Sequence, residues 1–465
     1  MTVHQLRLLV FVAGVVLLNS VYAMSSYDAF STEGLAMSPP MASAARVGIC
    51  PIGKLPEQLT VHEAITRILC QDPAIRQAWS TARMRAAQLG LRKSEYLPRL
   101  DARLSRSANR SYDGYAEAIH SNNSTGNFSL SWVLFDFGRR DAALASAHQL
   151  LSAANADQNA AIQNAFLGAA QLYFAAQASN QRLAAAQQVM DLAKDTYIAA
   201  AEKYKAGAAA LSDRLRAKTA YTQASLHVSQ ERGALSSSLG TMALRMGLPA
   251  HTLVRLDEHV EALPSLDLII EVDELIRLAG QQHPRLVAVE ARTKAAQAAV
   301  QEASAMARPK IALTSSFGVT DYSVHGRGSR RKDMNIGLQL SIPLFSGFEQ
   351  TYQIRAAKAQ AATYAEEAEV ARLRLSVDVW TQHNGLRTEA ENLVHTSDLV
   401  NQSKQAMDIV QGRYQSGVGS MTEVLNAMET YAKAQEQHIS AMANWRALRL
   451  SLAAQLGRLG FWDLD

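Results

Sequence analysis

The chain of 465 residues has few of the residues that build cross-linked or metal-centred domains. Its two cysteines exclude a disulfide scaffold and a four-cysteine zinc site. Aromatic residues make up only 6% of a chain that is 48% hydrophobic, so alanine supplies much of the apolar content. This composition favours closely packed helices. Its apolar fraction excludes disorder over the whole chain.

Strong charge and the common catalytic motifs are also absent. The net charge of +4 is too small and too dispersed for a dedicated nucleic-acid-binding protein. No GxxxxGK[ST] and no GxSxG motif occurs, which excludes ATP hydrolysis and serine-hydrolase chemistry by those routes. His62-Glu63 begins a string like HExxH, but Thr66 replaces the second histidine of the zinc pair. We expect no enzyme activity, cofactor or metal.

The first 23 residues have the features of a secretory signal peptide. An apolar run, Leu8–Leu18, precedes the small residues of a cleavage site at Val21-Tyr22-Ala23. The run is too short to span a bilayer comfortably, and no later stretch reaches the ~18 apolar residues of a helical span. Export is therefore favoured over a membrane anchor.

Residues 24–54 are rich in Ser, Ala, Met and Pro, and we predict a flexible leader. In an oxidising compartment a disulfide between Cys50 and Cys70 would fasten this leader to the first helix. The alternative is that Cys70 is simply a buried apolar residue of that helix. The residues do not choose between the two.

The chain contains one internal repeat. Landmarks recur 210 or 211 positions apart: Asp72-Pro73 and His283-Pro284, Tyr204-x-x-Gly207 and Tyr414-x-x-Gly417, Tyr221 and Tyr431. A register kept over several landmarks indicates an internal duplication. We predict a first structural repeat over residues 55–248, a linker over 249–270, a second repeat over 271–458 and a tail over 459–465.

Each repeat predicts the order helix, strand, loop, strand, long helix, turn, helix. In the first repeat Val61–Glu95 is helical, and Leu100–Leu104 and Phe128–Leu134 alternate apolar with polar residues as strands do. The polar residues 109–126 between them indicate an exposed loop. Trp132 is predicted to anchor at a lipid interface.

The second repeat predicts strands over Ile311–Tyr322 and Ile336–Leu344, with a basic loop, His325–Lys332, between them. Its basic residues favour a solvated or lipopolysaccharide-facing loop over a nucleic-acid site. They are Arg327, Arg330, Arg331 and Lys332.

Two helical runs are too long for a compact domain. Arg139–Ala206 and Glu349–Ser416 contain no proline and only three glycines between them. At 1.5 Å per residue each run is ~100 Å long, which indicates a coiled coil or an extended tube.

The alternating strands point to a pore. Alternation of apolar with small polar residues over about ten positions is typical of membrane β-barrel strands, although soluble sandwiches alternate too. Four strands cannot close a barrel, and lipid does not tolerate their open edges. Closure requires oligomerisation, with 12 strands from three chains or 16 from four. A secreted coiled-coil tether without a pore would explain the helices but not the strands.

These features resemble the TolC family of bacterial outer-membrane efflux and secretion channels over residues 55–458. The shared order is Pro and strand, then Leu-Phe, then a long helix and Tyr-x-x-Gly, twice over. Leu69-Cys70-Gln71-Asp72-Pro73 and Ala78-Trp79 resemble the type I secretion, cyclolysin-secretion-like branch most. The resemblance implies a mainly α fold with β: a homotrimeric 12-stranded outer-membrane barrel continued by a coiled-coil helical barrel through the periplasm.

The resemblance also implies a function and partners. The chain would be the passive outer-membrane exit duct of a type I protein secretion system, docked through a periplasmic adaptor protein onto an inner-membrane ABC or proton-driven transporter. The alternative is the outer-membrane component of a tripartite small-molecule or drug efflux pump.

The family's periplasmic gate maps onto numbered positions here. Its two acidic rings fall on Glu423 and Asn426, so one ring keeps its charge and the other loses it. Its closing arginine falls on Gly419, which removes the usual clamp. The tip-turn contacts that the resemblance implies are Tyr204, Gly207, Asp213, Tyr414 and Gly417.

Overall fold

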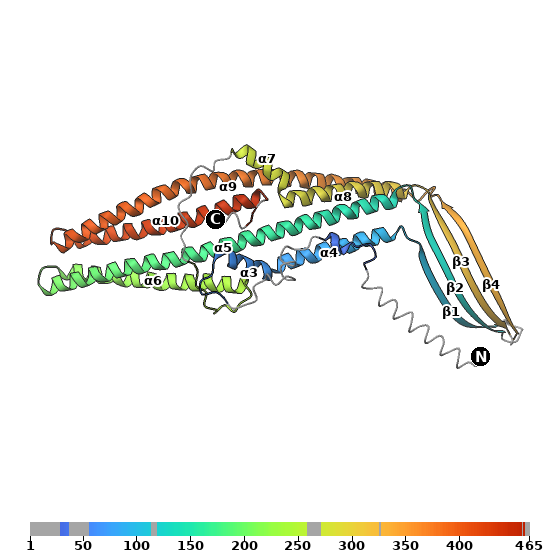
Figure 1. The fold of residues 1–465 in the computed structure, drawn as a ribbon, viewed down its shortest axis with the longest axis horizontal. Coiled ribbons are helices and arrows are strands. Elements are labelled where there is room, and N and C mark those ends of the chain that lie inside the picture. The colour runs from blue at the N-terminus through green and yellow to red at the C-terminus, as the bar shows by residue number, and fades with distance from the viewer. Residues whose placement is uncertain are drawn as a thin grey trace. The chain divides into compact units, whose positions relative to one another are not determined.

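The computed structural model describes residues 28–36, 55–112, 119–257, 271–324, 327–457 and 459–460. The predicted signal peptide, Cys50, residues 258–270 of the predicted linker and residues 461–465 of the predicted tail lie outside the described residues. In chain order the elements (Figure 1) are η1 (Glu33–Leu35), α3 (Val61–Gln71), α4 (Pro73–Ser94), β1 (Arg99–Ser111), β2 (Ile119–Phe135), α5 (Arg139–Lys205), α6 (Leu211–Arg245), α7 (Val272–Gln282), α8 (Pro284–Met306), β3 (Lys310–Val324), β4 (Arg327–Ser341), α9 (Glu349–Gln415) and α10 (Met421–Gln455).

Equal helix lengths confirm the internal duplication. The two long helices, α5 and α9, have 67 residues each, and the helices that follow them, α6 and α10, have 35 each. The short helices α3 and α7 have 11 residues each, and α4 and α8 have 22 and 23. Both long helices end one residue before the bounds that the absence of proline predicts.

The predicted first helix is two helices, because a proline divides it. Asp72 has extended backbone (ψ 119°), and its carboxylate accepts a hydrogen bond of 2.7 Å from the N–H of Ala74. Pro73 then occupies the first position of α4, where its missing N–H costs no helical hydrogen bond. His283 and Pro284 repeat this break between α7 and α8.

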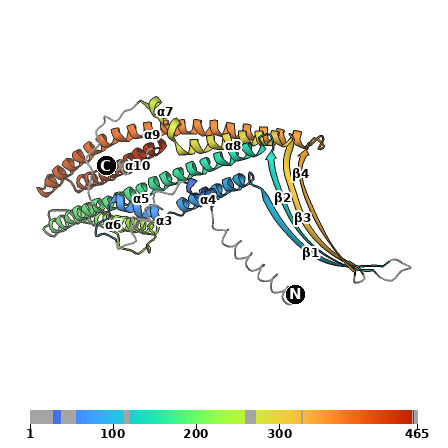
Figure 2. The ribbon, with the colours of Figure 1, turned by 45° about the vertical axis from the view of Figure 1, so that its right-hand side comes forward.

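The four strands form one antiparallel sheet in the order β1-β2-β3-β4 (Figure 2). Its central pair, β2 and β3, joins the two repeats: Phe128 lies opposite Phe317, and Trp132 lies opposite Leu313. The two outer strands, β1 and β4, each pair with a single neighbour. The sheet therefore has two open edges, which a further strand can join.

Each strand begins or ends further toward its hairpin than the sequence predicted, and both predicted loops were wrong. At its other end β4 stops at Ser341, three residues before the predicted Leu344. Most of residues 109–126 lie in β1 and β2, and β4 begins at Arg327, so the basic residues are in a strand. Pairing continues there because the hydrogen bonds of the ladder join backbone groups and do not require apolar side chains. Where apolar side chains are missing, the sequence no longer alternates apolar with polar residues, so this signal of a strand is absent.

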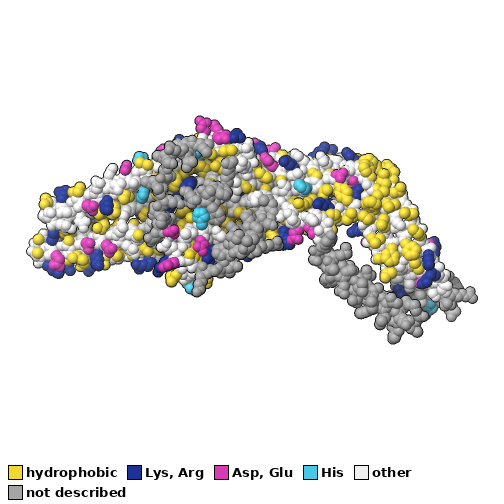
Figure 3. Space-filling view, in the orientation of Figure 1, with side chains coloured by type: hydrophobic (Ala, Val, Ile, Leu, Met, Phe, Trp, Pro, Cys, Tyr) yellow, Lys and Arg dark blue, Asp and Glu magenta, His cyan; other side chains and the backbone are white. Residues whose placement is uncertain are grey.

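The sheet has one apolar and one polar face. Residues directly opposite each other on paired strands share a face, so the register assigns every side chain. The apolar face carries Leu100, Leu104, Phe128, Leu130, Trp132, Leu313, Phe317, Met334, Ile336, Leu338 and Leu340, and the polar face carries Asp101, Arg103, Ser129, Ser131, Thr314, Ser316, Gly337 and Gln339. The large apolar residues are exposed: Met334 is 77% exposed and Leu338 is 71% exposed. Figure 3 shows hydrophobic side chains gathered over the strands.

The chain divides into two compact units. The first contains the sheet, with Trp79–Asn155 and Val289–Glu367. In this unit residues 28–36, within the predicted leader, pack on α4 and α5: Ala36 joins a buried cluster with Ala82, Leu89 and Leu151.

The second unit contains the tips of the long hairpins and the main hydrophobic core. In that core the segment at Leu59 bridges in parallel to Leu256, and the hydroxyl of Tyr173 donates to the carbonyl of Leu59 at 3.0 Å. Burial, with a contribution from the charge of Asp257, raises the pKa of Tyr173 to about 12.

Candidate functional site

Two matching turns connect the long helices to the helices that follow them. Gly207 (φ +73°) ends α5 and Gly417 (φ +83°) ends α9. In each turn the glycine N–H donates to the carbonyl of the tyrosine three residues earlier, Tyr204 or Tyr414, and the next N–H donates one residue further back. This is the Schellman arrangement, and its positive φ explains the Tyr-x-x-Gly spacing. We call residues 206–210 and 416–420 the tip turns.

The two hairpins pack against each other beside the tip turns. Ala200 and Ala217 of the α5–α6 hairpin lie in one buried cluster with Tyr414, Met421 and Val424 of the α9–α10 hairpin. Alanines at the contact allow the helix backbones to approach closely. Figures 1 and 2 both show the α5–α6 and α9–α10 turns as neighbours.

Two polar contacts join the hairpins at this packing cluster. Lys203 donates from Nζ to the backbone carbonyl of Tyr414, and its ammonium lies 4.3 Å from the centre of the Tyr414 ring. Arg216 donates to the hydroxyl of Thr422 at 2.7 Å. The Lys203 ammonium lies at the carboxyl end of α9, where the helix dipole favours a positive charge.

Glu423 lies in the first turn of α10. Its N–H donates to the side-chain oxygen of Ser420, the N-cap residue, at 3.2 Å. The Glu423 side chain is exposed, as is that of Asn426 three residues later. Residues three apart lie on one helix side. A negative charge in the first turn also stabilises the helix, so Glu423 has a structural role beside any role in a channel.

Tyr414 is the buried member of the predicted tip contacts. It is 6% exposed, and its hydroxyl has no hydrogen-bond partner among the described residues. Burial, and to a lesser extent the charge of Asp213, raises the pKa of Tyr414. Asp213 is half-buried at the start of α6, so the structure brings these two predicted residues near each other. Tyr204 instead has the guanidinium of Arg214 over its ring at 5.5 Å.

Gly419 packs tightly against the end of α9. A Cβ atom there would lie 3.1 Å from the backbone nitrogen of Tyr414 and 3.3 Å from Arg413 atoms. The Gly419 N–H also donates to the carbonyl of Arg413 at 3.2 Å. A larger residue would therefore require the tip turn to shift by a few tenths of an ångström.

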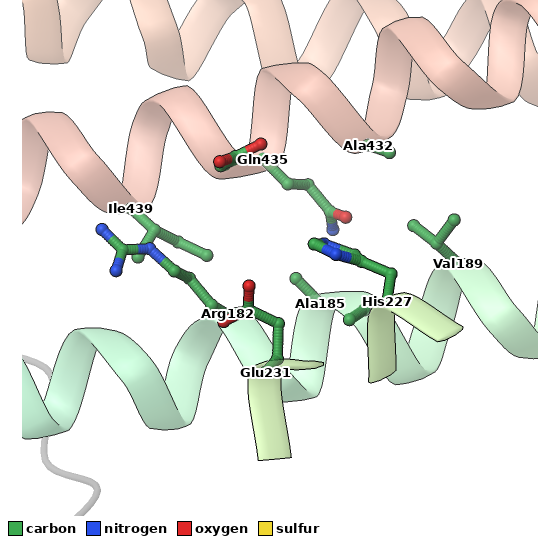
Figure 4. Close-up of a pocket in the computed structure, with 10 residues that line it drawn as sticks. Arg182, Ala185, Val189, His227, Glu231, Ala432, Gln435 and Ile439 are labelled. Atoms are coloured by element: carbon green, nitrogen blue, oxygen red, sulfur yellow. The ribbon is translucent and has the colours of Figure 1, made fainter. Parts of the chain in front are cut away.

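A small cavity lies between α5, α6 and α10 (Figure 4). Arg182, His227, Glu231 and Gln435 line it, and it holds about 40 Å³. Gln435 donates to Gln188 at 3.2 Å, which ties α10 to α5. A few water molecules fit this volume.

Cys70 lies in α3, and Cys50 lies outside the described residues. The pairing of Cys50 with Cys70 stays a prediction.

The sequence reasoning missed Lys203 and Arg216, which join the hairpins, because no local pattern marks a contact between distant helices. It also missed the N-cap at Ser420. The spacing Ser420-x-x-Glu423 is a capping-box signal and would have predicted the start of α10.

None of the helices in the described part of the chain has both the length and the apolar character to cross a membrane. The fold nevertheless defines a class: a mainly helical chain with a four-stranded sheet and an internal duplication, as in the outer-membrane channels.

The chain belongs to the family described as outer membrane efflux protein, whose model matches residues 64–247 and again residues 275–458. This confirms the resemblance to TolC-like channels and the two repeats. The chain is an outer-membrane protein. The family and the fold are those of channels and not of enzymes.

Among curated proteins, the chain is similar to Protein CyaE of Bordetella pertussis, with 29% identity covering 93% of this chain and 92% of that protein. It is also similar to the pyoverdine export outer membrane protein OpmQ of Pseudomonas aeruginosa, with 25% identity over 83% of this chain and 82% of that protein. Among solved structures, the outer membrane protein VceC of Vibrio cholerae has a TM-score of 0.75 at 19% identity, covering 85% of this chain and 96% of that one.

Proposed function

We propose that the chain is the outer-membrane exit duct of a type I protein secretion system, a passive homotrimeric channel. The open sheet carries this proposal. Each chain supplies four strands with one apolar and one polar face and two open edges. Three copies joined from β4 to β1 give a closed barrel of 12 strands, with the apolar face toward lipid and the polar face toward the lumen.

The helices continue the duct into the periplasm. At 1.5 Å per residue, 67 residues extend ~100 Å. A passive tube needs a partner that supplies energy, so we propose a periplasmic adaptor and an inner-membrane transporter, either an ABC or a proton-driven protein.

Similarity to CyaE over most of both chains, together with the resemblance of Leu69-Cys70-Gln71-Asp72-Pro73 to the type I secretion branch, supports protein secretion as the task. Similarity to OpmQ, named for pyoverdine export, favours the second candidate: the outer-membrane component of a small-molecule efflux pump. Deleting the gene separates the two. Loss of a secreted protein from the medium with unchanged small-molecule resistance supports the first, and the opposite result supports the second.

Within the channel we propose that Glu423 forms the constriction, with Asn426 beside it. Three copies place three carboxylates around the lumen, where the family pattern has two acidic rings. A charged ring attracts cations and excludes anions. Because Asn426 is neutral, the cation preference is mild.

Planar-bilayer conductance of the protein extracted from the outer membrane tests both the pore and the gate. We expect discrete, long-lived steps with mild cation preference. Glu423→Gln should move the ratio of cation to anion permeability toward one, and Asn426→Asp should raise it. Glu436→Gln is the matched control, because Glu436 is an exposed carboxylate of α10 that lies thirteen residues after Glu423, ~20 Å further along the helix and on a different side of it. Unchanged selectivity in Glu423→Gln rejects the gate assignment.

A further inference from the structure

Basic side chains continue the apolar face of the sheet toward its hairpin end. The ladder places Arg106 in one row with Ser124, Asp321 and Arg330, because each pairs with the next. Lys332 lies in the adjacent row, with Leu104 and Val319. We call Arg106, Arg110, Arg330 and Lys332 the basic row.

The basic row belongs to the same face as the apolar residues. Alternate residues of a strand share a face. Arg106 follows Leu104 by two positions, and Lys332 precedes Met334 by two. The basic residues of the predicted loop therefore lie in a strand, and their side chains alternate between the two faces of the sheet. Arg330 and Lys332 lie on the apolar face, and Arg331 lies on the polar face with Arg103.

At the hairpin end, the apolar face carries more positive than negative charge. Among its described residues Asp321 is the acidic side chain, and it holds Arg330 through two bonds of 2.7 and 3.0 Å. Four cations against one carboxylate leave three net positive charges per chain. On the polar face Arg331 pairs with Asp333 at 2.7 Å, and the ladder places Arg103 in the row of Asp333.

The basic row lies at the hairpin-side end of the apolar stretch of β4. Apolar side chains run from Met334 to Leu340 on this face, and six steps of ~3.4 Å give ~20 Å along the strand. At the ~45° tilt of membrane strands this is ~14 Å along the membrane normal, which lies within the ~25 Å apolar band of outer-membrane barrels. Lys332 and Arg330 come directly before this run, at the level of the lipid head groups.

The leaflet follows from the connections of the sheet. Helices α4, α5, α8 and α9 all join the end of the sheet opposite the two hairpins. Since these helices continue into the periplasm, the hairpin end faces the cell exterior. The outer leaflet there is built of lipopolysaccharide, whose lipid A part carries phosphate groups at head-group level.

We propose that the basic row binds the phosphates of lipid A in the surrounding outer leaflet. Arginine suits phosphate because its guanidinium donates two parallel hydrogen bonds. The site adjoins the apolar face, so one lipid places its acyl chains on Met334 and Phe128 and its phosphates on the basic row. The inference rests on the proposed barrel, which turns this face to lipid.

Binding of purified lipid A by the detergent-extracted protein tests the inference, with bis-phosphorylated and dephosphorylated lipid A as paired probes. The double variant Arg106→Gln/Lys332→Gln should bind the phosphorylated probe about 30-fold more weakly, because each head-group contact of a basic residue contributes roughly a factor of five. The matched control is Arg103→Gln/Arg331→Gln, which removes two arginines from the polar face of the same strands. We expect it to bind as the wild type does.

Two results would overturn the inference: equal binding of both probes, or equal loss in both double variants. Quenching of Trp132 fluorescence by brominated lipid separates this failure from that of the barrel. Trp132 lies on the apolar face, so quenching that disappears in Trp132→Phe shows that this face meets lipid. Quenching without lipid A binding rejects only the basic row. Absence of quenching rejects the proposed barrel orientation and the inference together.

Discussion

Replacing Lys203 with methionine should loosen the contact between the two hairpins. Methionine keeps the apolar stem that packs at the tip and removes the ammonium that bonds the Tyr414 carbonyl. The lost interaction joins α5 to α9, so its removal favours any state in which the hairpins move apart. Arg216 and Thr422 still connect the hairpins, and we therefore expect a shift in an equilibrium and not unfolding.

The magnitude follows from the two interactions that Lys203 makes. A hydrogen bond to a charged donor contributes ~1.5–3 kcal/mol, and a cation over an aromatic ring at an exposed site adds ~0.5–1 kcal/mol. The ammonium makes both at once and is half exposed to water, so the two values do not add in full. A loss of ~2 kcal/mol corresponds to a change of about 30-fold in the opening equilibrium.

Hydrogen–deuterium exchange at the second tip turn measures this shift. The N–H groups of Val418 and Gly419 donate to Arg413 and exchange only when the turn opens. In Lys203→Met we expect their exchange to be about 30-fold faster. Lys205→Met is the matched control, because Lys205 pairs with Glu202 within the same helix, with side chains 71% and 64% exposed. Exposed pairs of this kind contribute little. Equal exchange in both variants, or no change in Lys203→Met, would refute the reasoning.

Two further predictions concern stability. Gly417→Ala should destabilise the tip turn by ~1–2 kcal/mol, because Gly417 has a φ of +83°. Gly412 lies inside α9 with open space around the position of a new Cβ, so Gly412→Ala should stabilise the protein by ~0.5–1 kcal/mol. Urea unfolding of both variants measures the two changes, and equal effects would contradict the prediction. Burial lowers the pKa of His438 from 6.5, so the folded protein binds fewer protons than the unfolded chain. Stability present above pH ~6.5 should fall as the pH drops below that value, and His438→Asn should flatten the dependence when Tm is measured between pH 7.5 and 5.5. An unchanged slope in that variant would assign the acid sensitivity to other groups.

Regular local patterns made the helices predictable. The absence of proline over some 68 residues predicted the two long helices within one residue, since helix continuation depends on neighbours along the chain. The same local rule failed at Pro73, where a proline at the first position of a helix begins a new one. The duplication was visible because each repeat kept the same turn and break residues.

The strands were predictable only where they are amphipathic. Phe128 to Leu134 alternate because one face of the sheet is apolar and the other is polar, and there the prediction agreed with β2. Beyond the apolar residues both faces of the strands carry polar side chains, so the alternation disappears while the backbone ladder continues. Arg327 to Lys332 therefore looked like a loop and form part of β4.

At the candidate site the positions of the tip turns were predictable from the sequence, but the contacts between the two hairpins were not. Tyr-x-x-Gly marked both tip turns, because positive φ at Gly207 and Gly417 is a local requirement. The contact of Lys203 with Tyr414 joins residues 211 positions apart, and no spacing along one helix encodes it.

By itself the sequence determined the repeat, the long helices and the amphipathic strands, because helix continuation, turn geometry and alternation are properties of short segments. Only the tertiary structure decided which strands pair, which face each arginine takes and which side chains join the two hairpins. The physical reason is that register and helix packing depend on groups brought together from distant parts of the chain. A shift of one residue in the ladder would move Arg106 and Lys332 to the opposite face.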